Sequence, residues 1–125
     1  MNEEVTLPDG PEAASFARRA MARAADLWLL DREMTETALL LVSELATNAI
    51  RHGAPPVRLS LRLDKNRLRV EVTDSSPALP ELGHPGPDGI GGRGLQIVQQ
   101  LAAKWGASPR RLGKAVWFEL SGLLL

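Results

Sequence analysis

Three polar side chains recur at every fourth position within residues 39–53, LLLVSELATNAIRHG. They are Glu44, Asn48 and His52, and a helix of 3.6 residues per turn would stack them along one face. A carboxylate beside an amide offers a proton acceptor and an oxygen ligand for a hard cation such as Mg²⁺. Because the surrounding positions are apolar, such a pair is costly to bury unless an ion or ligand binds it. The alternative is the polar outer face of an amphipathic helix.

Asp74 and the glycine-rich segment GGRG at residues 91–94 are the next candidates for chemistry. Asp74 ends a predicted strand, where its carboxylate either accepts a hydrogen bond from an exocyclic amine or simply initiates a turn. In GGRG, the missing Cβ atoms would let backbone N–H groups approach a phosphate at the start of a helix. A flexible hinge would use the same glycines. The order of these features along the chain is therefore more informative than any one of them.

The elements that position these residues are predicted from hydrophobic periodicity. An amphipathic helix is expected from Pro11 to about Trp28, followed by a central helix that Asp31 caps and Gly53 ends. The apolar stripe of the first helix comprises Phe16, Ala17, Ala20, Met21, Ala24, Leu27 and Trp28. Its outer face carries Arg18, Arg19 and Arg23, either as a solvated surface or as a contact for an acidic partner.

Alternating apolar and polar residues predict the strands. Residues 57–63 and 67–73 form a hairpin with one buried face, and residues 5–7 are short and extended. Residues 74–92 are rich in proline and glycine, which is typical of a long loop that is either a functional lid or disordered. A third helix is expected from Arg93 to about Lys104, before strands at 107–111 and 115–120. These elements predict one α+β domain over residues 1–125, a two-layer sandwich of about three helices on a mixed, mostly antiparallel sheet.

Composition excludes several classes of function. Fifteen basic residues balance fifteen acidic ones, so nucleic acid is not an expected partner. The chain has no cysteine, and its two histidines are too few for a convincing metal cage. No apolar run reaches the roughly 20 residues that span a bilayer, and the N-terminus is acidic where a signal peptide would be basic. We expect a cytoplasmic protein with no membrane contact.

Four segments together resemble a known family. They are SELATNAIRHG at 43–53, the segment around Asp74 at 70–80, GGRGLQIVQQLA at 91–102 and GKAVWFEL at 113–120. In this order they resemble the N box, the two glycine boxes and the closing strand of the GHKL superfamily of ATP-binding domains, the Bergerat fold. Within that superfamily, they look like the anti-sigma-factor serine kinases and their solitary actinobacterial-type relatives. The resemblance covers nearly the whole chain.

The resemblance implies a role for each matched residue. Glu44 would act as the general base, or orient the attacking hydroxyl. Asn48 would bind Mg²⁺ through its amide oxygen, with the ion bridging the phosphates of ATP. Asp74 would accept a hydrogen bond from the adenine amine, and residues 75–91 would form the ATP lid. With ATP and Mg²⁺ as cofactors, the implied nucleotide contacts are Asn48, Asp74, Pro77, Gly92, Arg93, Gly94, Leu95 and Ala115. His52 would be a structural or ribose-side neighbour.

Two departures from the family pattern affect the expected pocket. The first glycine box is D-x-G-x-G in the wider superfamily, whereas here Ser76 and Ala78 take the places of the two glycines, which predicts a stiffer approach to the base. Ala115 stands where the family usually has threonine, and a methyl group cannot donate or accept a hydrogen bond. Loss of one ordinary hydrogen bond predicts a nucleotide affinity weaker by about 0.5–1.5 kcal/mol.

The expected activity is phosphoryl transfer from ATP to a protein serine or threonine. The resemblance implies a small anti-anti-sigma protein of the STAS type as substrate, a sigma factor as a possible second partner, and a possible homodimer. A histidine kinase is not expected, since no helix with a phosphoacceptor histidine precedes the domain within these 125 residues. Two alternatives remain open: a non-catalytic module in which nucleotide sets partner affinity, and a structural domain that binds no nucleotide.

Overall fold

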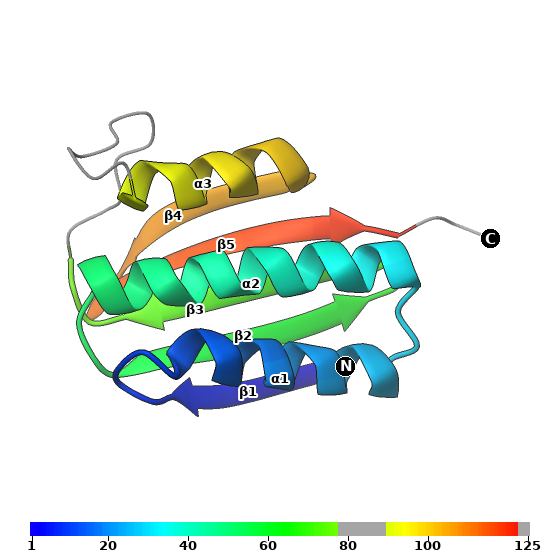
Figure 1. Ribbon diagram of the computed structural model, residues 1–125, viewed down its shortest axis with the longest axis horizontal. Coiled ribbons are helices and arrows are strands. Elements are labelled where there is room, and N and C mark those ends of the chain that lie inside the picture. The colour runs from blue at the N-terminus through cyan, green and yellow to red at the C-terminus, as the bar shows by residue number, and fades with distance from the viewer. Residues whose placement is uncertain (78–89, 123–125) are drawn as a thin grey trace.

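The computed structural model describes residues 1–77 and 90–122, with the backbone alone for residues 90–95. The described residues form three helices on one face of a five-stranded sheet (Figure 1). The elements are β1 (Asn2–Leu7), α1 (Ala13–Leu27), α2 (Arg32–His52), β2 (Val57–Asp64), β3 (Arg67–Asp74), α3 (Ile90–Leu101), β4 (Lys104–Arg110) and β5 (Gly113–Ser121). The strand order is β1-β2-β3-β5-β4. This arrangement confirms the α+β two-layer sandwich, although every strand pair is antiparallel and the sheet is not mixed.

The central hairpin forms as its alternation predicts. The apolar positions of β2 and β3 all face the helices and are buried: Val57, Leu59, Leu61, Leu63, Leu68, Val70 and Val72. Lys65 and Asn66 make the turn, with Lys65 at φ +58°. Each β2 residue from Arg58 to Asp64 pairs with β3, so the register that carries Asp74 to the edge of the sheet is set by this hairpin.

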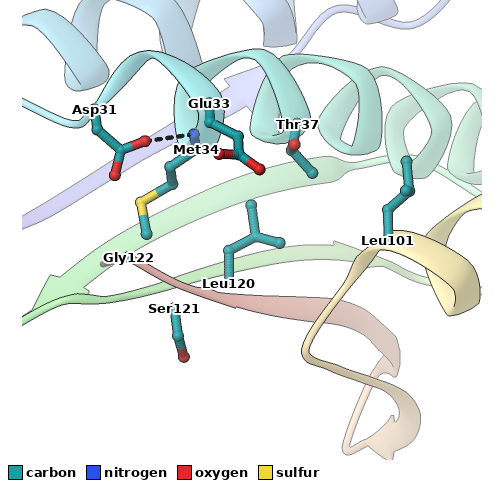
Figure 2. A pocket seen from close by; sticks show the side chains of 8 residues that line it. All are labelled: Asp31, Glu33, Met34, Thr37, Leu101, Leu120, Ser121 and Gly122. Carbon is teal, nitrogen blue, oxygen red and sulfur yellow. Dashed lines mark hydrogen bonds between the residues drawn. The ribbon is translucent and has the colours of Figure 1, made fainter. Parts of the chain in front are cut away.

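α2 lies between α1 and α3 and covers β3 and β5 (Figure 1). Its start is fixed by Asp31, whose Oδ1 accepts a hydrogen bond from Met34 N at 2.7 Å and so satisfies an orphan N–H of the first turn (Figure 2). Its end is fixed at Gly53, whose N–H donates to Ala49 O at 2.9 Å. Both predicted boundaries of the central helix are therefore confirmed.

The other boundaries differ from prediction by a few residues. α1 begins at Ala13, and its inner face includes Ala25, one turn after Met21, while Leu27 is 64% exposed. α3 begins at Ile90, three residues before the predicted start at Arg93. The prediction placed the start too late because glycine has a low helix propensity, and the first turn of α3 contains glycines. α3 also ends earlier, at Leu101, because the Ala103 N–H already donates to Glu119 O of β5 at 2.9 Å.

The last two strands are likewise longer than their patterns predict. β4 begins at Lys104, within the predicted third helix, and β5 begins at Gly113, within the predicted turn. Gly113 has φ +149°, and a Cβ atom there would lie 1.9 Å from Asp74 O. Only glycine fits this position, which brings the start of β5 directly against the end of β3.

Replacing Gly113 with alanine tests this close approach. We expect G113A to lower the free energy of unfolding by about 1–3 kcal/mol, since the backbone conformation is sparsely populated for alanine and its methyl group would overlap Asp74. Thermal or denaturant unfolding measures the change. The control is L112A at the neighbouring position, where the side chain is 81% exposed and the expected change is within about 0.5 kcal/mol. Equal stability of the two variants would contradict the close approach of position 113 to Asp74.

Candidate functional site

Four elements have an end at one edge of the sandwich. The C-terminal ends of α2 and β3 and the N-terminal ends of α3 and β5 all lie at the left side of Figure 1. The segments that resemble family motifs are on these elements. The fold therefore gathers residues that are more than 60 positions apart in the sequence, such as Gly53 and Lys114, around Asp74.

Asp74 is the most enclosed charged group at this edge. Its Oδ1 atom accepts hydrogen bonds from Ser76 N at 2.8 Å, Lys114 Nζ at 3.2 Å and Ala54 N at 3.3 Å. The side chains of Asp74 and Lys114 are only 1% and 2% exposed. Asp74 is therefore not a simple surface turn residue: its charge is neutralised inside the protein by a buried ammonium group.

Glycine and serine neighbours shape the surroundings of this ion pair. A Cβ atom on Gly53 would lie 2.6 Å from Asp74 Oδ2, so glycine is required for the turn after α2 to pass the carboxylate. Ser75 Oγ donates to Pro55 O at 2.6 Å, and Ser75 N donates to Ala54 O at 2.8 Å. These bonds fasten the residues after β3 to the connection between α2 and β2.

Lys114 was not among the residues predicted for the site. The turn chemistry of Leu112-Gly113-Lys114 assigned it to a loop, but in the structure it is the second residue of β5 and pairs with Asp74 across the β3–β5 ladder. A signal was present in the sequence, because Lys114 is two and four residues before the buried Val116 and Phe118. With side chains alternating along a strand, that spacing places Lys114 on the buried face.

The same register changes the expectation for Ala115. Ala115 pairs with Thr73, one position away from the Asp74–Lys114 pair, and successive side chains of a strand point to opposite faces. The Ala115 methyl group therefore lies on the face of the sheet opposite to Asp74. Lys114 is the β5 side chain beside the carboxylate.

The polar stripe of α2 leads from the interior to the surface. Asn48 is 8% exposed, and its side-chain amide makes no hydrogen bond with the described residues. Glu44, one turn earlier, is half-buried and forms no ion pair with the described part of the chain, while His52 is exposed. No fully buried side-chain N or O atom of the described residues lacks a partner, so the unpaired amide of Asn48 is not completely enclosed. An amide and a carboxylate without such partners are suited to a ligand.

This donor set fits a magnesium ion that a ligand brings with it. No group of three or more acidic, histidine or cysteine side chains that could hold a metal occurs within residues 1–77 and 90–122. Asn48 alone would supply one oxygen. Mg²⁺ commonly takes only one or two protein oxygens and completes its shell with water and phosphate.

The remaining predicted contacts lie near the start of α3 or beside the undescribed segment. Gly92, Arg93, Gly94 and Leu95 are in the first two turns of α3, whose backbone alone is described. The N–H groups of a first helical turn have no partners within the helix, which suits them to a phosphate. Pro77 is exposed, and most of the predicted lid, residues 78–89, lies outside the described residues.

A separate hollow of about 220 Å³ lies at the opposite end of α2 (Figure 2). Its lining comes from the start of α2, the end of α3 and the end of β5, and includes Thr37, Leu101 and Leu120. At 1.5 Å per residue, Thr37 is roughly 16 Å along the helix from Asn48. None of the predicted site residues lines this hollow.

Among the described helices, none is both long and apolar enough to cross a membrane.

Comparison with known proteins identifies the family. The model of the family described as "Histidine kinase-like ATPase domain" matches residues 7–120. An uncharacterized protein of Streptomyces coelicolor, SCO4941, is 39% identical over 88 residues, which are 65% of this chain and 82% of that protein.

Solved structures share the fold. The RsbU and RsbW domains of Rv1364c from Mycobacterium tuberculosis superpose with a TM-score of 0.75 at 16% identity, over 98% of this chain and 32% of that one. The histidine kinase domain of the blue-light activated histidine kinase from Erythrobacter litoralis EL346 gives a TM-score of 0.55 at 22% identity, over 91% of this chain and 64% of that one. This chain thus spans about a third of the first structure and just under two thirds of the second. With the family model matching nearly the full length, the chain belongs to the histidine kinase-like ATPase domain family, the ATP-binding domains of the GHKL superfamily.

Proposed function

We propose that this chain binds ATP with Mg²⁺ at the edge formed by α2, β3, α3 and β5, and transfers the terminal phosphoryl group to a serine or threonine of a partner protein. The observation that carries the proposal is the α2 stripe, where Asn48, 8% exposed and with an amide unpaired among the described residues, lies one turn from the half-buried Glu44. The family supports ATP as the nucleotide. The implied partner is a small STAS-type anti-anti-sigma protein, and the same chain would sequester a sigma factor.

Asp74 and Asn48 bind the two ends of the nucleotide in this proposal. Asp74 lies at the end of β3 with one oxygen, Oδ2, that receives no hydrogen bond from the described residues, and this oxygen accepts from the adenine amine. Asn48 supplies its amide oxygen to the Mg²⁺ ion that neutralises the phosphates. The backbone N–H groups of the first turn of α3, including that of Gly92, meet the phosphate oxygens.

Glu44 acts on the incoming hydroxyl. Residues four apart on a helix are neighbours, about 5–6 Å between their Cβ atoms, so Glu44 lies beside the position where Asn48 would hold the phosphates. Its carboxylate accepts the proton of the serine or threonine hydroxyl as that oxygen bonds to the γ-phosphorus. The bond to the β-phosphate oxygen breaks, and ADP leaves.

The competing function is a binding module without catalysis, in which the nucleotide only sets the affinity for a partner. The loss of the glycine-rich box after Asp74 favours it, because Ser75 and Ser76 fasten that segment to Asp74 and to the connection after α2. The presence of Glu44 beside Asn48 favours catalysis. The two functions differ in the fate of the γ-phosphate, which can be measured.

The first test is the Mg²⁺ dependence of ATP binding. Titration calorimetry of the parent should show ATP binding that tightens when Mg²⁺ is added, and N48A should lose at least about tenfold in affinity in the presence of Mg²⁺, since one of the few protein ligands is gone. N66A is the matched control, because Asn66 is an exposed residue of the β2–β3 turn. An N48A variant with the parent's Mg²⁺ dependence would remove Asn48 from the metal site, and no ATP binding by the parent would refute the proposed function.

The second test separates catalysis from binding. We expect E44Q to bind ATP like the parent but to transfer labelled phosphate to a STAS-type protein about 10²- to 10⁴-fold more slowly, because glutamine cannot accept the proton. The control is E36Q, at an exposed position of the same helix where Glu36 pairs with Arg32 at 3.1 Å. Transfer by E44Q at the parental rate would show that Glu44 is not the base. Absence of transfer by the parent, with ATP binding intact, would favour the binding module.

A further inference from the structure

Lys114 is the buried charged group that the proposed chemistry leaves without a role. Its side chain is 2% exposed, and Asp74 Oδ1, at 3.2 Å, is its hydrogen-bond acceptor within the described residues. An ammonium group has three N–H donors. Burying the other two N–H donors without acceptors is costly, so Lys114 Nζ is suited to donate to a further acceptor.

The two carboxylate oxygens of Asp74 differ in how many hydrogen bonds they accept. Oδ1 receives all three hydrogen bonds that the described residues supply, from Ala54 N, Ser76 N and Lys114 Nζ, and Oδ2 receives none of them. A Cβ atom at position 53 would lie 2.6 Å from Oδ2, so glycine there keeps a side chain away from this oxygen. A carboxylate oxygen has lone pairs for at least one further donor.

We infer that Lys114 and Asp74 together read the base, with Asp74 Oδ2 accepting from the adenine amine and Lys114 Nζ donating to the neighbouring ring nitrogen, N1. The inference rests on the proposed function and deepens it. Adenine carries this donor and this acceptor side by side on one edge. The protein has an acceptor, Oδ2, that receives no hydrogen bond from the described residues, on the same carboxylate whose Oδ1 lies 3.2 Å from the donor Lys114 Nζ. The ion pair has no net charge, so a neutral base can enter without leaving an unpaired charge in the interior.

The register explains why lysine can serve here. Lys114 faces Asp74 directly across the β3–β5 ladder, and Ala115 faces Thr73. Family resemblance pointed to position 115 for a base contact and to a lost hydrogen bond there. With Lys114 as the donor, a charge-assisted hydrogen bond is available at the neighbouring position, and such bonds are roughly twice as strong as neutral ones.

Replacing single atoms of the nucleotide tests this without altering the protein. In calorimetry on the parent with Mg²⁺, 1-deaza-ATP, which has C–H in place of N1, should bind about 10- to 100-fold more weakly than ATP, because a hydrogen bond to a charged donor is lost. The control is 7-deaza-ATP, which keeps the N1 edge and should bind like ATP. Equal affinity for ATP and 1-deaza-ATP would overturn the role of Lys114. So would equal affinity for ATP and GTP, since guanine has a donor at N1.

A variant of Lys114, combined with the altered nucleotide, shows whether the two changes remove the same hydrogen bond. K114M should bind ATP about as weakly as the parent binds 1-deaza-ATP, and it should no longer distinguish the two nucleotides. K65M, in the exposed β2–β3 turn, is the matched control and should behave like the parent. If K114M does not fold because Asp74 loses its partner, the double variant D74N/K114M removes both charges. The comparison of ATP with 1-deaza-ATP on the parent protein still decides whether Lys114 contacts N1. Failure of the parent to bind ATP refutes the proposed function, whereas ATP binding without discrimination at N1 refutes only this inference.

Discussion

The ion pair between Asp74 and Lys114 is the constraint on which this edge of the molecule depends. Both side chains are almost fully buried, and breaking such a pair by removing one partner typically costs about 3–5 kcal/mol because a charge is left uncompensated. The pair can form only if β3 and β5 keep the register that places these residues opposite each other. It also requires glycine at position 113, where a Cβ atom would collide with the Asp74 backbone, and at position 53, where one would collide with its side chain. Two glycines and one register thus serve a single electrostatic contact.

α2 carries Asn48, proposed to bind the metal ion, and Glu44, the proposed base, alongside this contact. Its core-facing residues, among them Leu41, Leu45 and Ala49, fix the helix over β3 and β5. The same rotation of the helix brings Asn48 to the border of the core and leaves Glu44 half-buried. Because Asp31 and Gly53 fix both ends, Asn48 and Asp74 are held by parts of one packed unit. The distance between Asn48 and Asp74, the proposed metal-binding and base-binding groups, is therefore set by core packing.

Local chemistry accounts for what could be predicted from the sequence. Alternation gave the faces of the β2–β3 hairpin, and an N-cap and a terminal glycine gave the limits of α2. The start of α3 at Ile90 was missed because glycine propensity argues against a helix that tertiary contacts with α2 support. Lys114 was missed for a different reason: its partner is 40 residues away, and only strand register, a non-local property, decides whether position 114 or 115 faces Asp74.

The serines that follow Asp74, in place of a glycine-rich box, add to this constraint. In such a box the backbone is free to adopt many conformations, whereas here Ser76 N donates to Asp74 Oδ1 and Ser75 bonds to Ala54 and Pro55. The carboxylate is therefore held from three directions: by its own following turn, by the connection after α2, and by Lys114. An acceptor fixed in this way loses little conformational entropy when a base binds. In the proposed site, the departures from the family pattern would replace a flexible approach to the base with a preorganised one, and the buried lysine would supply the donor beside Asp74.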